Sequence, residues 1–272
     1  MKDYKEEYYK QSIFWDRNFL EIPAEKERLE EIIKIIPSDV QTILDVGCGN
    51  GAFINTIADT FLNRFDRIAG LDSSEEALKY VKVEKHKSNI SSLPFRNKSF
   101  DLVTSLEVLE HLPQKDFKKG VLELQRVAKK YIIITVPNED DIEHSLVMCP
   151  ICHCWFNPYF HMRSFNKNIL YNLFNNFKLI KVKGIGPFLE YRSYNRLLLT
   201  FYRAWRIPLP PINAICPQCG YQHNKALQNI KNNNSSCSIL KPLLLFKPLA
   251  KVIWPLKKKK RWLLALYEKS DK

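Results

Sequence analysis

The feature that most constrains this chain is a glycine-rich turn after a short apolar stretch. Residues 43–51 read Ile-Leu-Asp-Val-Gly-Cys-Gly-Asn-Gly, and a second apolar stretch, residues 67–71, runs into Asp72. The three glycines let the backbone turn tightly and bring its N–H groups against a ligand, toward which a helix at 52–63 would direct its positive end. Because the carboxylate of Asp72 can accept both hydroxyls of a ribose, the two stretches predict a site for a nucleoside-containing cofactor.

Asp45, two residues before the first glycine, distinguishes between two kinds of nucleoside cofactor. The run Gly47-x-Gly49-x-x-Ala52 also satisfies the looser fingerprint of dinucleotide-binding proteins. A carboxylate at Asp45 would repel the pyrophosphate of a dinucleotide in a partly dry loop, whereas it would attract the ammonium group of S-adenosyl-L-methionine. The run Asp45-x-Gly47-x-Gly49-x-Gly51 resembles the first motif of the class I S-adenosylmethionine-dependent methyltransferases, and implies this cofactor.

A second block, residues 89–112, resembles the same family, in particular its type 11 members and those of the ubiquinone pathway. Asn89, expected to end the third strand, can hydrogen-bond the adenine edge while the N–H of Ile90 meets a ring nitrogen. Many relatives have Asp at this position, and Asn offers the same carbonyl acceptor. The resemblance covers residues 40–137, and it implies a cofactor site formed by Asp45, Gly47, Cys48, Gly49, Gly51, Asp72, Ser73, Asn89, Ile90, Ser105 and Leu106.

Short apolar stretches alternate with helical patterns along the first two thirds of the chain. Fully apolar strands are typical of a parallel sheet that is covered on both faces, so we expect an α/β, doubly wound, Rossmann-like fold. The resemblance implies seven strands, the last of them antiparallel. We expect strands at 41–46, 67–71, 87–90, 100–105, 130–136, 178–184 and 262–267, and helices at 4–16, 24–36, 52–63, 74–82, 114–128 and 167–176.

Two insertions, after the fifth and sixth strands, each carry a Cys-Pro-x-Cys motif. The motifs are Cys149 to Cys152 and Cys216 to Cys219, and such a turn directs both thiolates at one ion. Both connections leave the sheet edge at which the cofactor would lie, so we expect a structural zinc at Cys149, Cys152, Cys216 and Cys219 in a substrate lid. Two alternatives are unligated thiols and a ligand set in which one sulfur is replaced by Cys154, His153, His161 or Cys237.

The predicted domains follow from these insertions. Residues 1–186 would form the methyltransferase core, within which residues 138–165 carry the first cysteine pair. Residues 187–260 would form a basic insertion with the second pair, and residues 261–272 would return to the core as the last strand.

The catalytic groups are expected just after the fourth strand, in the run Glu107-Val-Leu-Glu110-His111. Methyl transfer is a direct displacement that needs alignment and often one base. On a helix, positions 107 and 111 would share a face with 110 beside them. The run resembles the Glu-x-x-Glu-His element of some O-methyltransferases, including those of the ubiquinone pathway and of small-RNA 3′-end methylation.

The resemblance to that element implies a divalent cation, such as magnesium, that lowers the pKa of a substrate hydroxyl. Its ligands would be Glu107, Glu110 and His111, and His161 matches a further histidine of the RNA enzymes. Two other interpretations remain open. Glu107 could line the methionine part of the cofactor, or a histidine could act as a general base without metal.

The positive charge of the chain is concentrated in its last third. Residues 187–272 hold 16 Lys and Arg against 3 Asp and Glu, so that 16 − 3 = +13 accounts for the whole net charge. Such a basic segment favours an anionic target. Residues 239–261 combine proline-interrupted apolar turns with five consecutive basic residues, which suits an anionic membrane surface, a basic lid that touches phosphates, or a segment that covers the core.

No run of eighteen uncharged apolar residues and no signal peptide are visible, so we expect reduced thiols and a cytoplasmic protein that could lie at a membrane surface. These patterns predict an S-adenosylmethionine-dependent methyltransferase that acts on a hydroxyl oxygen of a small molecule, glycan or lipid-linked acceptor, which could be anionic. An RNA methyltransferase is the first alternative. The second is a non-catalytic, zinc-containing scaffold with the same fold. No motif in the sequence identifies the methyl acceptor or the oligomeric state.

Overall fold

The computed structural model describes residues 15–16, 18–61, 63–143, 145–191, 200, 215–221 and 257–270. It divides into two compact units, which are described separately. We call the first unit the core, formed by residues 7–140, 162–187 and 260–272. We call the second the cysteine unit, formed by residues 1–6, 141–161 and 188–259. The predicted insertions at 138–165 and 187–260 thus contribute most of their residues to the same unit.

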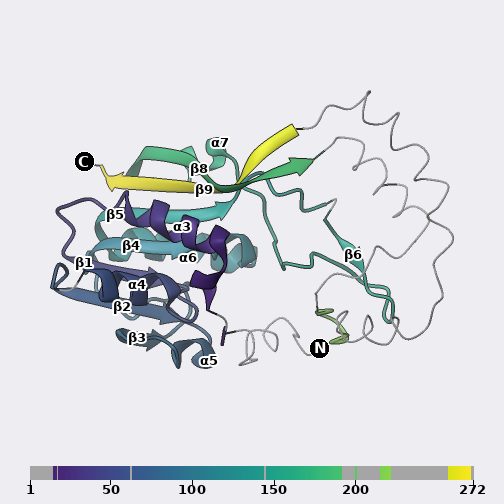
Figure 1. The fold of residues 1–272 in the computed structure, drawn as a ribbon, viewed down its shortest axis with the longest axis horizontal. Coiled ribbons are helices and arrows are strands. Elements are labelled where there is room, and N and C mark those ends of the chain that lie inside the picture. Colours follow the sequence, from purple (N-terminus) through teal and green to yellow (C-terminus); the bar gives the residue numbers. More distant parts are fainter. Residues whose placement is uncertain are drawn as a thin grey trace. The chain divides into compact units, whose positions relative to one another are not determined.

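The core contains a seven-stranded sheet in the order β3-β2-β1-β4-β5-β9-β8 (Figure 1). Neighbouring strands among β1 to β5 pair in parallel, and β9 pairs antiparallel with β5. This order confirms the predicted Rossmann-like class and the antiparallel last strand. The strands are β1 (Thr42–Val46), β2 (Arg67–Asp72), β3 (Glu84–Lys87), β4 (Phe100–Leu106), β5 (Ala128–Pro137), β8 (Phe177–Tyr191) and β9 (Lys257–Lys269).

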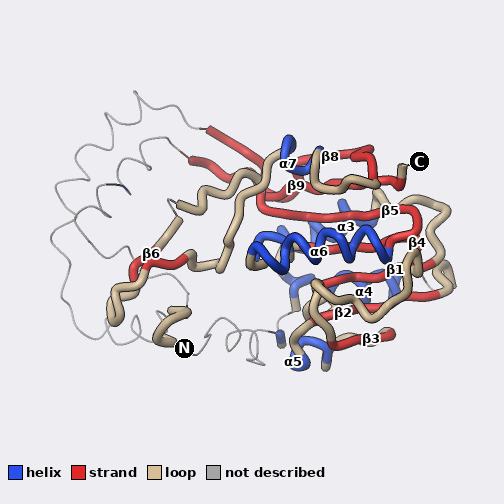
Figure 2. The backbone as a smooth tube through the Cα atoms, turned by 180° about the vertical axis from the view of Figure 1, so that it is seen from behind, coloured by secondary structure: helices blue, strands red, loops and turns tan. Residues whose placement is uncertain are grey.

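Helices cover both faces of the sheet, as Figures 1 and 2 show from opposite sides. One face carries α3 and α4, whose buried residues pack in one apolar cluster with Leu78 of α5. The other carries α6 and α7, which contribute Leu124 and Leu170 to a second cluster. The helices are η1 (Phe19–Glu21), α3 (Pro23–Ile33), α4 (Ala52–Thr60), α5 (Glu75–Leu78), η2 (Leu109–His111), α6 (Gln114–Val127) and α7 (Lys167–Tyr171).

The sequence pattern of α6 explains why it packs as it does. Val121, Leu124 and Val127 recur at three-residue spacing, and all three are buried. Spacing of this kind places the side chains on one face of a helix. Burying each of them contributes about 2 kcal/mol to the stability of the core. Apart from the exposed Leu122, the opposite face of α6 is polar, and it bears two of the charged residues that are described below.

Several predicted boundaries differ from those in the structure. The third strand occupies Glu84–Lys87 rather than 87–90, and its exposed, charged side chains gave no apolar pattern to read. The helices predicted at 74–82 and 167–176 are the shorter α5 and α7. Asn172 caps α7, where its N–H donates to the carbonyl of Ile169. In addition, the cysteine unit contains a two-stranded sheet of β6 (Val147–Met148) and β7 (Trp155–Phe156) that we did not predict.

The last strand begins earlier than expected. β9 starts at Lys257, so the basic run 257–261 lies within the strand rather than before it. Lys260 donates from its Nζ to the carbonyl of Gly186, 2.7 Å away. The rest of the predicted membrane-binding stretch, Cys237 and most of the helix predicted at 4–16 lie outside the described residues. Within the described part of the chain, no helix is both long and apolar enough to cross a membrane.

Candidate functional site

The glycine turn connects β1 to α4 and has left-handed backbone conformations at all three glycines. The φ angles of Gly47, Gly49 and Gly51 are 78°, 54° and 80°. The N–H groups of Gly47 and Cys48 both donate to the carbonyl of Leu71, at 2.7 and 3.0 Å, which holds the turn against β2. A Cβ atom on Gly47 would lie 2.4 Å from Val108, so a side chain at this position would both clash and be strained. The turn is therefore a cradle that only glycine permits.

Asp72 lies at the carboxyl end of β2 and joins that strand to the glycine turn. One carboxylate oxygen accepts from the N–H of Gly49 at 2.9 Å, and the other accepts from the N–H of Ser74 at 2.8 Å. Burial raises the pKa of Asp72, while these backbone donors partly offset the rise. A carboxylate has about four lone-pair positions, so each oxygen can still accept from a ribose hydroxyl. The neighbouring Ser73 is exposed.

Asp45 is a buried carboxyl near the carboxyl end of β1, which lies between β2 and β4 in the sheet. Its side chain is 2% exposed, and Thr104 Oγ1 donates to its Oδ1 at 2.6 Å. Burial raises the pKa of Asp45 to about 7, against the opposing effect of the Thr104 hydrogen bond. The charge of Asp72 raises this pKa further, and the charge of Arg28 lowers it. A bound cation would therefore stabilise the ionised form of Asp45.

Asn89 and Ile90 lie beyond β3 and begin the connection to β4. Asn89 is exposed, and its side-chain oxygen accepts from the N–H of Ser91 at 2.9 Å. This bond closes a short turn, so only one lone pair of the oxygen remains for an adenine amine. Ile90 is buried in the core. The predicted adenine contact is thus compatible with this geometry, but it shares the acceptor with the turn.

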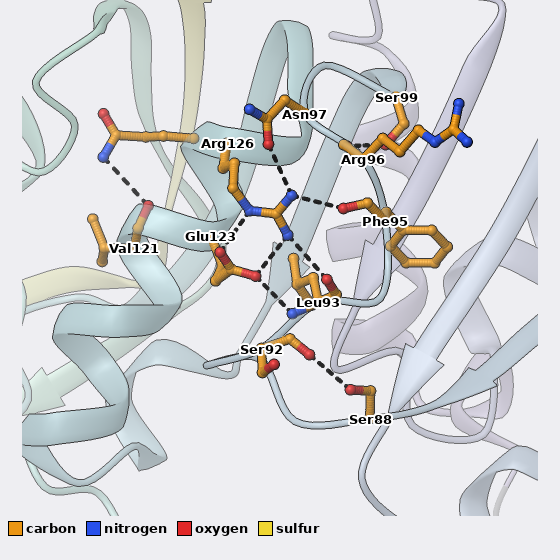
Figure 3. Close-up of polar contacts among 11 residues, drawn as sticks. Ser88, Ser92, Leu93, Phe95, Arg96, Asn97, Ser99, Val121, Glu123 and Arg126 are labelled. Atoms are coloured by element: carbon orange, nitrogen blue, oxygen red, sulfur yellow. Dashed lines mark hydrogen bonds and ion pairs between the residues drawn. The ribbon is translucent and has the colours of Figure 1, made fainter.

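Arg126 of α6 holds the connection between β3 and β4 in place, a role that we did not predict (Figure 3). Its guanidinium donates to the backbone carbonyls of Leu93 and Phe95 and to the side chain of Asn97, at 2.6 to 3.0 Å. Glu123 pairs with Arg126 and accepts from the N–H of Leu93 at 2.7 Å. Residues 93–97 follow the predicted adenine contacts directly. The spacing of Glu123 and Arg126 on the polar face of α6 was the available signal.

The run from Glu107 to His111 does not form the predicted α-helical face. Glu107 has a left-handed φ of 58°, and its N–H donates to the carbonyl of Thr135 at 3.0 Å. After Val108, the three residues Leu109–His111 form the 3-10 turn η2. The prediction that Glu107 and His111 share a helical face is wrong, because the chain bends sharply where it leaves β4. Ser105 and Leu106 end that strand, and Ser105 is fully buried.

Glu110 has the least favourable environment of the acidic side chains in this run. It is 0% exposed, and among the described residues neither of its carboxylate oxygens has a hydrogen-bond partner. Burial raises its pKa well above the usual value, and the charge of Glu107 adds to the rise. The nearest ring nitrogen of His111 lies 3.8 Å from Glu110. A buried carboxyl without hydrogen-bond donors is destabilising, so this position favours a cation or a donor beside the carboxylate.

His161 is the last residue of the segment 141–161, which belongs to the cysteine unit. The core resumes at Met162, whose N–H donates to the carbonyl of Glu110 at 2.7 Å.

Arg28 of α3 is a second residue that we did not predict. Its guanidinium donates to Thr135 Oγ1 at 3.2 Å and pairs with Glu25. Its charge lowers the pKa of both Asp45 and Glu110. From the sequence, the apolar residues Leu29 and Ile32 indicated that this helix covers the core, but nothing indicated a role for Arg28. Arg28 nevertheless supplies positive charge beside a cluster of carboxylates, which lessens their mutual repulsion.

The cysteine unit brings both predicted pairs together. One ligand atom from each of Cys149, Cys152, Cys216 and Cys219 lies within 4.8 Å of the other three. This arrangement is compatible with zinc. Cys154 is also close, with its sulfur 3.3 Å from that of Cys216. The structure thus joins insertions that follow β5 and β8, as the motifs predicted.

Comparison with known proteins identifies the core. Residues 44–134 match the family model described as a methyltransferase domain. Residues 44–134 thus belong to a class I S-adenosylmethionine-dependent methyltransferase domain. In an uncharacterized protein of Methanocaldococcus jannaschii, 104 residues are 38% identical, covering 37% of this chain and 42% of that protein. The small RNA 2′-O-methyltransferase of Arabidopsis thaliana is 29% identical over 140 residues, which cover 44% of this chain and 14% of the plant protein.

A third relative is named for ubiquinone biosynthesis rather than for RNA. Solved structures also share the fold. The ubiquinone biosynthesis O-methyltransferase of Albidiferax ferrireducens is 31% identical over 97 residues, 32% of this chain and 37% of that enzyme. Matches thus span less than half of each of these relatives. A chain from the Haloferax volcanii complex of the Trm112 methyltransferase activator superimposes with a TM-score of 0.55 at 12% identity, covering 99% of this chain and 97% of that one.

An S-adenosylmethionine-dependent methyltransferase from Archaeoglobus fulgidus superimposes with a TM-score of 0.51 at 18% identity, covering 90% of this chain and 92% of that one. At such low identities the two structural matches speak for the fold alone.

Proposed function

We propose that the protein transfers the methyl group of S-adenosylmethionine to a hydroxyl oxygen of an acceptor that is small, glycan-like or lipid-linked. The observation that carries this proposal is the pair of buried carboxyls, Asp45 and Asp72, on either side of a glycine turn that permits no side chain. A buried carboxyl is destabilising unless a ligand or a donor compensates it. Asp72 already accepts from two backbone N–H groups and Asp45 from Thr104, and S-adenosylmethionine would add two ribose hydroxyls and an ammonium.

Six of the predicted cofactor residues have a specific contact in this proposal. Asp72 accepts the ribose hydroxyls with the lone pairs that Gly49 and Ser74 leave free. Asp45 stabilises the ammonium through its negative charge. The polar groups of Asn89 and the N–H of Ile90 contact the adenine, while Ser105 and Leu106 line the methionine part. When bound, S-adenosylmethionine supplies an activated methyl group, and these residues hold its sulfur at a fixed position.

Glu107, Glu110 and His111 are proposed to lie at the acceptor side of the site. Glu110 has buried oxygens without a hydrogen-bond partner among the described residues, and these would suit a divalent cation such as magnesium. The two named methyltransferases among the relatives reported above are O-methyltransferases by name, and this favours an oxygen acceptor. A cation in this position would lower the pKa of the acceptor hydroxyl.

The cation proposal is tested by replacing Glu110 and His111 with alanine and measuring methyl transfer with and without added magnesium. We expect magnesium to stimulate the unaltered protein and to leave the double variant unaffected. Asp116→Asn, an acidic position in the first turn of α6, serves as the matched control. If the chelated protein transferred methyl groups at the same rate as the magnesium-loaded one, the cation would be dismissed and the methyltransferase proposal would remain.

RNA is the second candidate acceptor, because the excess charge of +13 lies in residues 187–272 and one relative is named as a small RNA enzyme. Basic residues bind phosphates regardless of sequence, so such binding should weaken at high salt. Purified protein would be treated with nuclease and its ultraviolet absorbance ratio compared with an untreated sample. A labelled-methyl assay on total RNA and on lipid and glycan extracts then identifies the acceptor class. Label in nuclease-sensitive material would replace the small-acceptor proposal with the RNA one.

The third candidate is a scaffold without activity, and a test of cofactor binding distinguishes it from the two enzymes. A scaffold has no need of the compensated carboxyls, so it would show no heat on titration with S-adenosylmethionine.

A further inference from the structure

The two Cys-Pro-x-Cys turns of the cysteine unit have the same backbone hydrogen bonds. In the first turn, the N–H of His153 donates to the carbonyl of Cys149 at 3.0 Å, and in the second, that of Gly220 donates to Cys216 at 2.9 Å. The N–H of the first cysteine then donates to the carbonyl five residues on, in Cys154 or in Tyr221, at 2.9 Å in both turns. Residues 149–154 and 216–221 are therefore equivalent structures.

The equivalence extends to the backbone conformation of the fifth residue of each turn. Gly220 has a φ of 75°, and His153 has a φ of 57°, both in the left-handed region. Glycine adopts this conformation freely, but histidine does so only at a cost in free energy. The first turn keeps the conformation of the second without the glycine that favours it. This points to a common constraint on both turns, which a shared ion supplies.

The sulfur atoms of the two turns face each other. Cys149 Sγ lies 3.6 Å from Cys219 Sγ, and Cys152 Sγ lies 3.5 Å from Cys216 Sγ. A zinc ion with bonds of about 2.3 Å to four sulfurs separates them by about 3.8 Å, close to these distances. Each short distance joins one turn to the other across 64 to 70 positions of the chain. The four sulfurs thus lie around one centre.

Cys154 is the fifth thiol of this cluster, and the equivalence of the turns determines its role. Its sulfur lies 3.4 Å from that of Cys152 and 3.3 Å from that of Cys216, so distance alone would allow it as a ligand. In the second turn, however, the equivalent residue is Tyr221, and the thiols occupy only the first and fourth positions. We propose that Cys149, Cys152, Cys216 and Cys219 bind one structural zinc ion, and that Cys154 lies beside the site without binding the metal.

The surroundings explain why a metal is needed there. Among the residues of the cysteine unit that the structure describes, the apolar cluster has four buried members, and two of these are Cys149 and Cys216 themselves. The others are Val147 and Phe156, with Tyr221 and the remaining cysteines packed against them. Such a cluster buries too little apolar surface to hold two distant segments together. The zinc ion supplies that link, and this role is independent of the acceptor of the methyl group.

The test uses full-length protein and serine variants of the five cysteines. Metal content is measured by plasma mass spectrometry, and cobalt is substituted for zinc so that its visible absorption reports a tetrahedral sulfur site. We expect one zinc per chain in the unaltered protein and in Cys154→Ser, and loss of at least half of the zinc in each of the four other variants. An iron content in place of zinc, or equal loss in Cys154→Ser, would overturn the proposal.

A second measurement keeps the proposal testable if a ligand variant fails to fold. The unaltered protein is alkylated under native conditions, with and without a zinc chelator, and the modified peptides are identified by mass spectrometry. Zinc-bound thiolates react slowly, so we expect Cys154 to react first and the four ligands to react only after chelation. If Cys154 were protected from alkylation and became reactive together with Cys152 on chelation, Cys154 would be a ligand and the assignment would be refuted.

Discussion

The core and the cysteine unit differ in what holds each of them together. The core has two large apolar clusters, one on each face of a continuous sheet, and side chains such as Ile57 and Leu124 are completely buried. The described part of the cysteine unit has one small cluster in which thiols are half of the buried members. The first region is stabilised by apolar burial, whereas we propose that zinc bound to four thiolates stabilises the second. The same chain therefore contains two regions that should respond differently to the same perturbation.

Removal of zinc should separate the two regions most strongly. A structural zinc typically contributes on the order of 10 kcal/mol to the segment that binds it, which is more than the small cluster can replace. We expect a chelator to abolish the protection of residues 147–156 and 215–221 against hydrogen exchange. Protection in β1 and β4 should be unchanged, because apolar contacts hold those strands. Simultaneous loss of protection in β1 would show that the regions do not differ in this way.

The replacement Gly47→Ala should damage the core and spare the zinc. The new methyl group would lie 2.4 Å from Val108 and would be strained at a φ of 78°. We expect the free energy of unfolding to fall by about 3 kcal/mol, from clash and strain together, as measured by denaturant titration. Adding Val108→Ala should recover about half of the loss by removing the clash alone. A double variant no more stable than the single one would contradict the proposed close packing.

Arg126→Ala should affect cofactor binding more than turnover. The change removes the donors that hold residues 93–97, so the adenine contacts that precede them would have to be ordered on binding. We expect the KM for S-adenosylmethionine to rise about tenfold while kcat changes less than twofold. Arg96→Ala, an exposed arginine of the same connection, is the matched control and should change neither. An equal fall in kcat would place Arg126 outside this positioning role.

The pH dependence of cofactor binding gives the smallest expected effect. Because burial raises the pKa of Asp45 to about 7, this carboxyl is largely protonated in the free protein at pH 6. The ammonium of the cofactor favours the ionised form, so binding releases a proton at low pH and the affinity increases as the pH rises. We expect the Kd to fall by about eightfold at most between pH 6 and 7.5. Asp45→Asn should abolish this slope, and an unchanged slope would assign it to another group.

Some parts of the fold could be predicted because their residue patterns are compatible with few backbone structures. The glycine turn and the apolar stretches of β1 and β4 could be assigned from sequence, since buried strands and left-handed turns accept few side chains. β3 was misplaced because it is an exposed edge strand without an apolar pattern. The two Cys-Pro-x-Cys motifs also predicted that their sulfurs would lie together, as a shared metal site would require.

The two arginines whose roles were not predicted from the sequence share one property. Arg28 and Arg126 act through hydrogen bonds to groups that lie far away in the sequence, for example Thr135 and the carbonyl of Phe95. Local periodicity describes which face of a helix is buried, but not which distant carbonyl an arginine reaches. Likewise, the bend at Glu107 results from the path of the chain off β4, which no helical spacing could show. Predictions from sequence fail here because the cause is a tertiary contact.

The most direct test of the central claim is a calorimetric titration of the full chain with S-adenosylmethionine and, in a parallel experiment, with NAD⁺. The claim is that the glycine turn and its flanking carboxyls, Asp45 and Asp72, form a pocket for S-adenosylmethionine. We predict binding of one S-adenosylmethionine per chain with a micromolar Kd, or about −8 kcal/mol, and no binding of the dinucleotide, whose pyrophosphate Asp45 would repel. Binding of NAD⁺, or no heat with S-adenosylmethionine, would contradict the account.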